Sequence, residues 1–396
     1  MFIRRRRRGV LIPYQASVLK LLSPGIVGMP DVLSHPIQAY LERIDGSARP
    51  GGNGHRSRLL QLAIGEVRME VYPGVHQLRI PIPDNPLGFL NSYLIRGDKG
   101  CLLIDTGWNT DEAFQSLGDQ LQDLGLGLSD IALVVITHVH PDHYGLAGRI
   151  KQSTPTRFAF HLWEKAVVES RYIHYSELQA KIGQLLLRHG VPEQVRPPLQ
   201  SASMPTLDLV SVAWPDEVLY GGEIFSFGEF QLEVLWTPGH APGHVCLYEP
   251  AKKLLFAGDH ILPTITPNVH YHLQSGSNPL SDYLNALRQL KRLPVDLVLP
   301  AHEHIFTDMG KRIQAIIDHH DERNLHILRI IERAPMTAYS IAEELPWNVP
   351  GEGWGRLSPL MQRFAVMEAI AHLEFLRMEG RVQRLVSNDI ILYGLQ

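Results

Sequence analysis

The sequence predicts a layered α/β sandwich followed by a small separate domain. Two runs of mixed strand patterns, with helical stretches between them, favour stacked sheets over one doubly wound parallel sheet. From Gly310 onward the pattern changes to long helical stretches that end in a hairpin. A chain of 396 residues is long enough for two or three domains. We therefore expect an N-terminal extension and linker over residues 1–66, a main domain over residues 67–308 and a C-terminal domain over residues 309–396.

The first 66 residues show little of the hydrophobic periodicity that is typical of a buried core. Residues 4–8 are all arginine and precede a short apolar stretch that Pro13 interrupts, which favours a basic extension over a secretory signal. A targeting segment and an over-long start remain alternatives. Apolar spacing predicts a helix or two over residues 32–44, and the glycine-rich residues 46–57 predict a linker.

In the main domain the elements follow from hydrophobic periodicity. Residues 67–80 and 91–105 alternate and turn like strands of a sheet. Further apolar runs predict strands at residues 131–136, 156–160, 217–221, 224–227, 231–236, 244–248, 253–257 and 294–300. Helical spacing predicts helices at residues 110–124 and 161–189. The pair Pro141-Asp142 predicts that another helix begins near His143.

The C-terminal pattern predicts three helices and a hairpin. The helices are expected at residues 311–331, 336–345 and 358–380, and the hairpin strands at residues 381–386 and 389–393. Thr337 is the expected N-cap of the second helix, and Gly380 is expected to end the third. Helices followed by a two-stranded wing make a small domain of their own.

Composition narrows the classes of partner. A net charge of −4 gives no general reason to expect a nucleic acid or an anionic membrane as partner. Only two cysteines occur, Cys101 and Cys246, which excludes a disulfide framework and fits a reducing, cytoplasmic compartment. No apolar run approaches the length needed to cross a bilayer, so no membrane partner is expected.

The strongest signal for chemistry is the run Thr137-His-Val-His-Pro-Asp-His143, which follows the apolar stretch 131–136. His138, His140, Asp142 and His143 place three imidazoles and a carboxylate within six positions. These are the nitrogen and oxygen donors that zinc and other borderline transition metals prefer. Three further candidates, His240, Asp259 and His302, each lie on a loop that leaves a predicted strand. The sequence thus predicts a metal site.

Together these motifs resemble the metallo-β-lactamase superfamily over about residues 67–308. The matching pieces, all in family order, are LIDTG at residues 103–107, THVHPDH at 137–143, TPGHAPGH at 237–244, AGD at 257–259 and PAH at 300–302. The resemblance implies an αββα sandwich with a dinuclear metal site along one edge of the sheets. One departure is Ala301, which stands where glycine is usual and leaves the local backbone geometry open.

The resemblance also implies a role for each residue. His138, His140 and His240 would hold the first metal, whereas Asp142, His143 and His302 would hold the second. Asp259 would bridge both ions and, with Asp142, take part in catalysis. Asp105 would orient a ligand without touching the metal, although a carboxylate that only satisfies turn amides is an equal interpretation. His304 is an alternative to His302, and His244 resembles a motif residue outside the metal contacts.

The implied reaction is hydrolysis by a metal-bound hydroxide. We expect two Zn²⁺ per chain, with iron or manganese as alternatives, acting on an ester-type carbonyl of a small-molecule thioester or lactone. The alternative is a metal-dependent phosphodiesterase or endoribonuclease, for which a nucleic acid would be the substrate. A second alternative is a mononuclear iron persulfide dioxygenase, which shares the HxHxDH run. The hydroxyacylglutathione hydrolases and lactonases of the superfamily suggest the reaction type, not the substrate.

Residues 311–396 resemble the winged-helix domain appended to a subgroup of lactamase-like hydrolases. Residues 334–396 hold five arginines against seven acidic side chains, which favours a packing or dimerisation module over a nucleic-acid reader. We therefore expect this domain to wall the active site, and a homodimer is an option. Substrate contacts are expected from residues 83–89, from the segment of Tyr172 and Tyr175, and from residues 261–272, which include His270.

Overall fold

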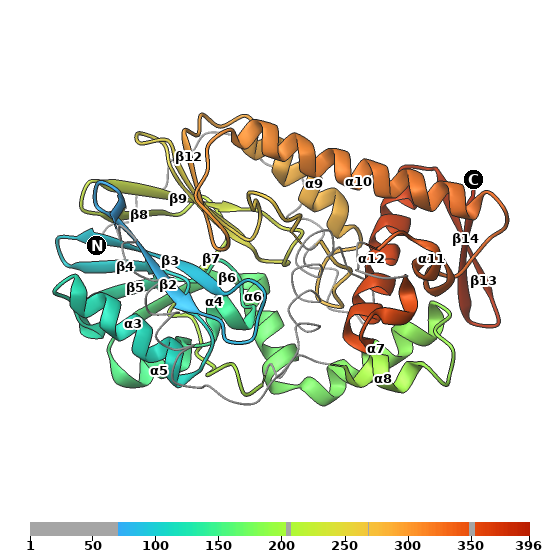
Figure 1. Cartoon of the computed structure of the whole chain (residues 1–396), viewed down its shortest axis with the longest axis horizontal. Helices are drawn as coiled ribbons and strands as arrows, with labels where there is room; N and C mark the ends of the chain where they lie inside the picture. Colours follow the sequence, from blue (N-terminus) through green and yellow to red (C-terminus); the bar gives the residue numbers. More distant parts are fainter. Residues whose placement is uncertain (1–69, 203–206, 268, 348–352) are drawn as a thin grey trace, which may run out of the picture.

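The computed structural model describes residues 70–202, 207–267, 269–347 and 353–396. The expected extension and linker over residues 1–66, with the helix expected at residues 32–44, lie outside this range. Two β-sheets pack face to face, and helices cover the outer face of each (Figure 1). This four-layer arrangement confirms the predicted αββα sandwich.

The first sheet has seven strands in sequence order. They are β1 (Glu70–Tyr72), β2 (Val75–Pro81), β3 (Phe89–Gly97), β4 (Gly100–Ile104), β5 (Ile131–Val135), β6 (Arg157–His161) and β7 (Glu217–Leu219). Strands β4 to β7 are parallel to one another. Their carboxyl ends therefore meet at one edge of the sheet. The second sheet has the order β12-β11-β10-β9-β8. It is formed by β8 (Ile224–Phe227), β9 (Phe230–Trp236), β10 (Val245–Glu249), β11 (Leu254–Gly258) and β12 (Leu297–Pro300).

Three apolar cores separate the four layers. Between the sheets, residues such as Tyr93, Val135 and Phe256 are buried. Outside the first sheet, Leu117 and Leu121 of α3 (Asp111–Asp123) pack with α4 (Pro141–Tyr144) and α5 (Ala147–Ser153). Outside the second sheet, α9 (Pro279–Leu290) packs with the first half of α10 (Met309–Ile331). Burial of this apolar area is the main stabilising contribution to the sandwich.

Two helical expectations for the main domain need correction. The single helix expected at residues 161–189 is broken into α6 (Leu162–Val168), the π-helical turn η3 (Glu169–Ile173) and α7 (Tyr175–Arg188). The π-helical turn ends at His174, and within it the side chain of Tyr172 is buried, with its hydroxyl donating to the Val139 carbonyl. Helix α9 was not expected. Its signals were an N-cap at Asn278 followed directly by Pro279.

The C-terminal elements agree with the expected ones. They are α10, α11 (Ala338–Glu344), α12 (Pro359–Met378), and the antiparallel strands β13 (Val382–Ser387) and β14 (Ile390–Leu395). Thr337 caps α11 by accepting a hydrogen bond from the Ser340 amide, and Gly380 adopts a φ of 72° just past α12. That these elements form a winged-helix domain stays a prediction.

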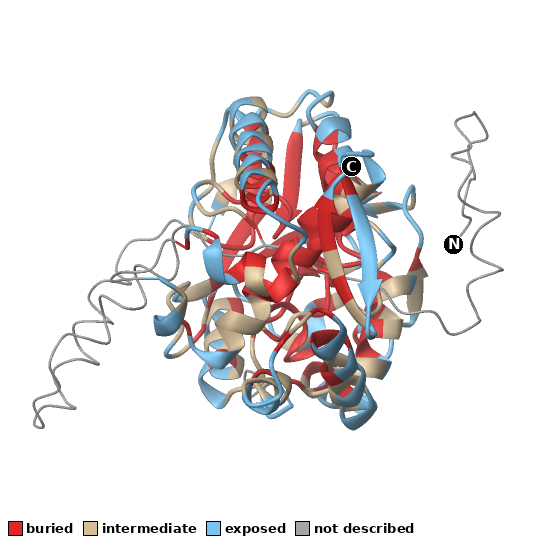
Figure 2. Ribbon diagram, turned by 90° about the vertical axis from the view of Figure 1, so that its right-hand side faces the viewer, coloured by how far each residue is buried: buried red, intermediate tan, exposed pale blue. Residues whose placement is uncertain are grey.

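A fourth core unites the C-terminal helices with an insert from the main domain. Leu186 of α7 and Leu199 of α8 (Arg196–Ser201) pack against Ile370 and other apolar side chains of α12. The second half of α10 enters the same core. Figure 2, which faces the C-terminal end, shows buried segments in its interior and exposed strand and helix faces around them. Among the described residues no helix combines the length and apolarity required to span a bilayer.

Candidate metal centre

The candidate ligands meet because the loops that carry them leave the two sheets at one edge. Strand β4 leads into Asp105, β5 into the run from Thr137, β9 into the turn that holds His240, β11 into Asp259 and β12 into His302. Parallel pairing of β4 with β5 and of β11 with β12 places these carboxyl ends side by side. All seven candidate metal ligands come together here, and each is buried or half-buried.

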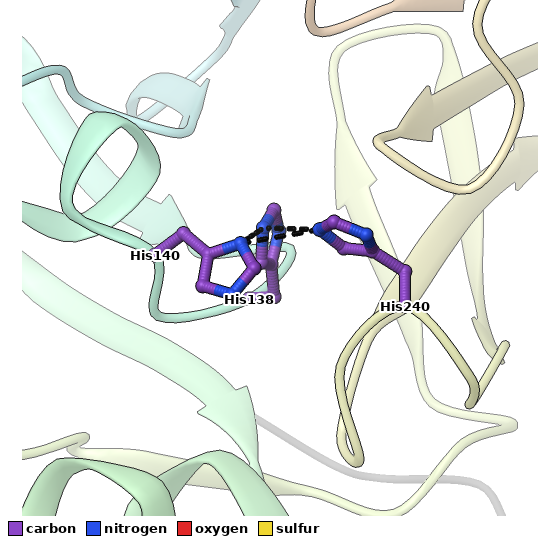
Figure 3. Close-up of side chains that lie close together, drawn as sticks. All are labelled: His138, His140 and His240. Atoms are coloured by element: carbon purple, nitrogen blue, oxygen red, sulfur yellow. Dashed lines mark hydrogen bonds between the residues drawn. The ribbon is translucent and has the colours of Figure 1, made fainter. Parts of the chain in front are cut away.

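The first group consists of His138, His140 and His240 (Figure 3). Nε2 of His138 lies 2.8 Å from Nδ1 of His140 and 3.2 Å from Nε2 of His240, and the remaining pair is 3.1 Å apart. Burial, followed by the neighbouring rings, holds the pKa of His138 and His140 well below the ordinary value. Three imidazoles thus direct nitrogen atoms at one point, as one face of a tetrahedral zinc site requires.

The second group is built around Asp142, His143 and His302. Nε2 of His302 lies 3.2 Å from Oδ2 of Asp142, and Nε2 of His143 lies 3.8 Å from the same oxygen. This donor set, two imidazoles and a carboxylate, again suits a divalent transition metal.

Asp259 lies between the two groups. Its Oδ2 is 3.7 Å from Nε2 of His240 and 3.4 Å from Nε2 of His143, while Oδ1 is 3.5 Å from Nε2 of His302. Burial alone would raise the pKa of this carboxyl, but the rings of His302 and His143 outweigh burial and lower it. An ionised carboxylate in this place is suited to contact two cations at once.

Asp105 and Thr137 fix the orientation of two rings. Oδ2 of Asp105 accepts from Nδ1 of His143 at 2.8 Å and from the Thr137 hydroxyl at 2.8 Å. The same hydroxyl oxygen lies 3.1 Å from Nδ1 of His138. Each ring therefore presents Nε2 to the centre, because its Nδ1 is held by protein. Asp105 also accepts from the Thr137 amide at 2.8 Å, so both interpretations of this residue agree with the contacts.

His302 and His244 differ in what their rings contact. Nδ1 of His302 lies 3.2 Å from the Phe89 carbonyl, which leaves Nε2 for the centre. His244 uses both nitrogens within the protein: Nδ1 lies 2.8 Å from the Thr237 hydroxyl, and Nε2 accepts from the Asp259 amide at 3.1 Å. His244 therefore holds the backbone of Asp259, and this supports its placement outside the metal contacts.

The turns that carry the ligands make demands on single residues. Gly239 adopts a φ of 132°, and an added Cβ would lie 2.3 Å from Cβ of Tyr283, so only glycine fits before His240. Ala301 is not among the described residues with positive φ, so alanine is accommodated without strain where glycine is usual. The exposed His304 stays outside both groups, which favours His302 as the ligand of this turn.

Bound metal ions explain the buried polar atoms of this site better than apolar packing or hydrogen bonds within the protein do. Nε2 of His143, Nε2 of His302 and Oδ1 of Asp259 are buried and have no hydrogen-bond partner. Burial of several such polar atoms without partners is costly in a protein interior. Cations at the two convergence points would satisfy these atoms.

Sequence reasoning missed Glu164, which joins the two ligand loops. Its side chain is fully enclosed in α6, where Oε2 accepts from the Val139 amide at 2.8 Å and Oε1 accepts from the Gly243 amide at 2.7 Å. Val139 lies between His138 and His140, and Gly243 lies in the turn that holds His240. The signal for this role was an acidic residue inside an apolar helix. Helical spacing alone does not show which residues such a side chain contacts.

Replacing Glu164 with glutamine should weaken metal binding by about 10-fold to 100-fold, the usual effect of losing a group that orients ligands. The amide keeps the shape of the side chain but turns an N–H toward one of the two backbone amides, which releases that loop. Competition with a chelator of known affinity measures the change. The exposed Glu169→Gln serves as control, and equal affinity of both variants would remove Glu164 from the metal centre.

Of the three side chains expected to touch substrate, two are committed elsewhere. The hydroxyl of Tyr172 donates to the Val139 carbonyl at 2.6 Å, so it supports the loop of His138 and His140. His270 is buried, with its ring 4.6 Å from that of Phe364 in α12. Tyr175 is half-buried, and its hydroxyl accepts from Gln179 at 3.2 Å. A substrate role for these three residues stays a prediction.

Comparisons with known proteins agree with this geometry. Residues 85–302 match the family model described as the metallo-beta-lactamase superfamily. A metallo-beta-lactamase family protein from Thermus thermophilus has a similar crystal structure, with a TM-score of 0.69 and 32% identity over 82% of this chain and 100% of that one.

Two curated relatives carry hydrolase names. The chain is 28% identical to the probable metallo-hydrolase YqjP of Bacillus subtilis, over 68% of this chain and 83% of the relative. It is 30% identical to the acyl-coenzyme A thioesterase MBLAC2 of Gallus gallus, over 54% of this chain and 73% of the relative. Both names agree with the chemistry that a centre of imidazole and carboxylate ligands can support.

Proposed function

Because the chain belongs to the metallo-β-lactamase superfamily and is a metal-dependent hydrolase, we propose that it hydrolyses a small-molecule ester-type carbonyl, with a thioester as the first candidate and a lactone as the second. The observation that carries the proposal is the position of Asp259 between two groups of imidazole and carboxylate ligands. The thioester is preferred because a relative is an acyl-coenzyme A thioesterase.

The residues that would hold the ions are those of the two groups. His138, His140 and His240 would hold one Zn²⁺, Asp142, His143 and His302 would hold another, and Asp259 would contact both. When bound, such ions activate water at neutral pH and polarise the carbonyl oxygen. Iron and manganese also accept this donor set.

Asp142 and Asp259 are the carboxylates that can act on the nucleophile. The side chain of Asp142 is 17% exposed and that of Asp259 12%, so both reach the open side of the centre. Burial raises the pKa of Asp142, but His143 and His302 bring it below the ordinary value. Both carboxylates are therefore ionised at neutral pH and can accept a hydrogen bond from the attacking water, which orients its lone pair toward the carbonyl carbon.

The experiment combines metal content with hydrolysis of a panel: a neutral thioester, an acyl-homoserine lactone, a phosphodiester and single-stranded RNA. We expect about two zinc ions per chain and metal-dependent turnover of thioester or lactone, lost in Asp142→Ala. RNA or phosphodiester cleavage that the same variant abolishes would replace the proposal by the nuclease alternative. One iron per chain without any hydrolysis would overturn it in favour of the dioxygenase.

We also propose a cytoplasmic location and a packing or dimerisation role for the C-terminal domain. Cys101 and Cys246 are both free and buried, which suits a reducing compartment. The acidic balance of residues 334–396 argues against a nucleic-acid partner for these helices. Sedimentation of the full chain separates a monomer from a dimer.

A further inference from the structure

Glu303 directly follows the candidate ligand His302 and adopts a backbone conformation that is rare for its residue type. Its φ is 64°, in the left-handed region, which is unfavourable for an L-residue because Cβ approaches the following carbonyl oxygen. The Glu303 carbonyl accepts a hydrogen bond from Nδ2 of the buried Asn91 at 3.1 Å. Strain of this kind persists only where surrounding contacts hold it, and it clusters at functional sites.

The side chain of Glu303 reaches the segment that follows Asp259. Its Oε2 accepts from the amides of Thr264 and Ile265, at 3.0 and 3.2 Å, and its Oε1 accepts from the Thr264 hydroxyl. Hydrogen bonds to an ionised acceptor are stronger than those between neutral groups. One carboxylate thus fastens the chain after Asp259 to the residue after His302.

The same two turns are also joined ahead of their ligands. The Ala301 amide, directly before His302, donates to the carbonyl of Gly258, directly before Asp259, at 3.0 Å. Oδ1 of Asp259 and Nε2 of His302 lie 3.5 Å apart. Hydrogen bonds on both sides of these two residues therefore fix the distance between their side chains, as ligands that share one metal ion require.

Arg312 holds the other edge of the segment after Asp259. From α10, its Nε and Nη2 donate to the carbonyls of Leu262 and Ile265, each at 2.6 Å. Glu303 thus binds amides of the segment, Arg312 binds its carbonyls, and Ile265 is held by both. Because the segment is fixed to α10, the contact with Glu303 attaches the turn of His302 to a rigid part of the fold.

Glu164 has a comparable place beside the first ligand group. Its two oxygens accept from the amides of Val139 and Gly243, which lie in the loops of that group. The ligands on these loops are His138, His140 and His240 (Figure 3). Glu164 therefore joins the two loops of the first group, whereas Glu303 joins the turn of His302 to the chain after Asp259.

We propose that Glu303 is a positioning residue for the metal ion of the second group, as Glu164 is for the ion of the first. The inference rests on the proposed function in one respect, because it requires a centre with two ions. Neither glutamate belongs to the candidate ligands, so each acts through the spacing of the ligands that its loops carry. Loss of the Glu303 carboxylate should then weaken the second ion selectively.

Zinc release from the loaded full chain tests this selectivity. The chain is equilibrated with rising concentrations of a chelator of known affinity, and elemental analysis gives the bound zinc. We expect two release steps, of which Asp142→Ala abolishes the one that belongs to the second group. Glu303→Ala should weaken zinc binding in that step by about 10-fold to 100-fold and leave the other step unchanged. Glu164→Gln should affect the other step.

Three further variants separate the carboxylate from general damage. The carboxamide of Glu303→Gln can still accept from both amides and donate to the Thr264 hydroxyl, so it should recover most of the loss. Glu303→Gly suits the left-handed backbone but lacks the carboxylate, and should show the same selective loss as Glu303→Ala. Glu223→Ala is the matched control, because the half-buried Glu223 also accepts from two amides, of Tyr220 and Gly221, both at 2.9 Å.

The outcomes separate this inference from the proposed function. Equal weakening of both steps in Glu303→Ala, or wild-type release, would overturn the positioning role and leave a hydrolase that turns over thioester or lactone intact. Wild-type release in Glu303→Gly would also overturn it. A selective loss in a chain that hydrolyses neither substrate would support the positioning role and sink the proposed activity. A single zinc in the wild-type chain would overturn the role together with the two-ion centre.

Discussion

Changing Asp259 to asparagine is expected to lower kcat/KM by about a thousandfold. Its carboxylate has oxygen atoms 3.4 to 3.7 Å from His143 and His302 of one group and from His240 of the other. Asparagine keeps the shape but removes the negative charge between the two ligand groups. Metal-based stabilisation of a transition state is worth several kcal/mol, which corresponds to a factor on the order of 10³.

Asp105→Asn provides a graded comparison. Asp105 holds Nδ1 of His143 directly and Nδ1 of His138 by way of the Thr137 hydroxyl, so its replacement should lower metal affinity by about 10-fold to 100-fold while leaving turnover of the fully loaded chain measurable. The exposed Asp296→Asn is the control. Elemental analysis gives the metal content of all three variants, and steady-state kinetics gives their turnover. Wild-type zinc content and turnover in Asp259→Asn would show that Asp259 does not join two ions.

The gathering of the seven candidate ligands could be predicted because it depends on local rules. Each ligand directly follows a strand pattern or lies in a turn between strands, and parallel strands bring their carboxyl ends to one edge. A spacing such as that of His138, His140 and His143 then indicates metal chemistry by residue type alone. The motif PAH already favoured His302 over His304, and the burial of His302 beside the other candidate ligands, with His304 exposed, agrees with that preference.

The residues that hold these ligands in place could not be predicted in the same way. Glu164 joins two loops that lie far from one another in the chain, and Thr137 acts through a hydroxyl that donates to Asp105. Nothing in their residue types marks them, since glutamate in a helix and threonine at a strand end are common. Their roles follow from distances that only the packed sandwich defines.

The fold shows the same division between local and long-range information. Caps such as Thr337 and the hairpin after Gly380 follow from nearby residues. By contrast, the break at His174 and the packing of α7 and α8 on α12 are set by contacts across the chain. Helix α10 takes part in two cores, one with the second sheet and one with the C-terminal helices. Hydrophobic periodicity could indicate that α10 exists but not that it connects both.

Replacing Arg323 with methionine is expected to destabilise the chain by about 3–5 kcal/mol. Arg323 on α10 pairs with Glu368 on α12, and their side chains are 7% and 0% exposed. The guanidinium also lies 4.7 Å from the ring of Trp347. Removal of the arginine leaves the charge of Glu368 in a core where desolvation is nearly complete, which costs far more than the net value of the pair.

The pair can be tested with a double-mutant cycle in urea. Arg323→Met/Glu368→Met should recover most of the lost stability, because two apolar side chains of similar volume can replace a buried ion pair at little cost. Arg333→Met is the matched control: Arg333 pairs with Glu344 at the surface, where the side chains are 63% and 39% exposed, so the change should cost under about 1 kcal/mol. If Arg323→Met shifts the unfolding midpoint no more than Arg333→Met, the ion pair between α10 and α12 is effectively solvated.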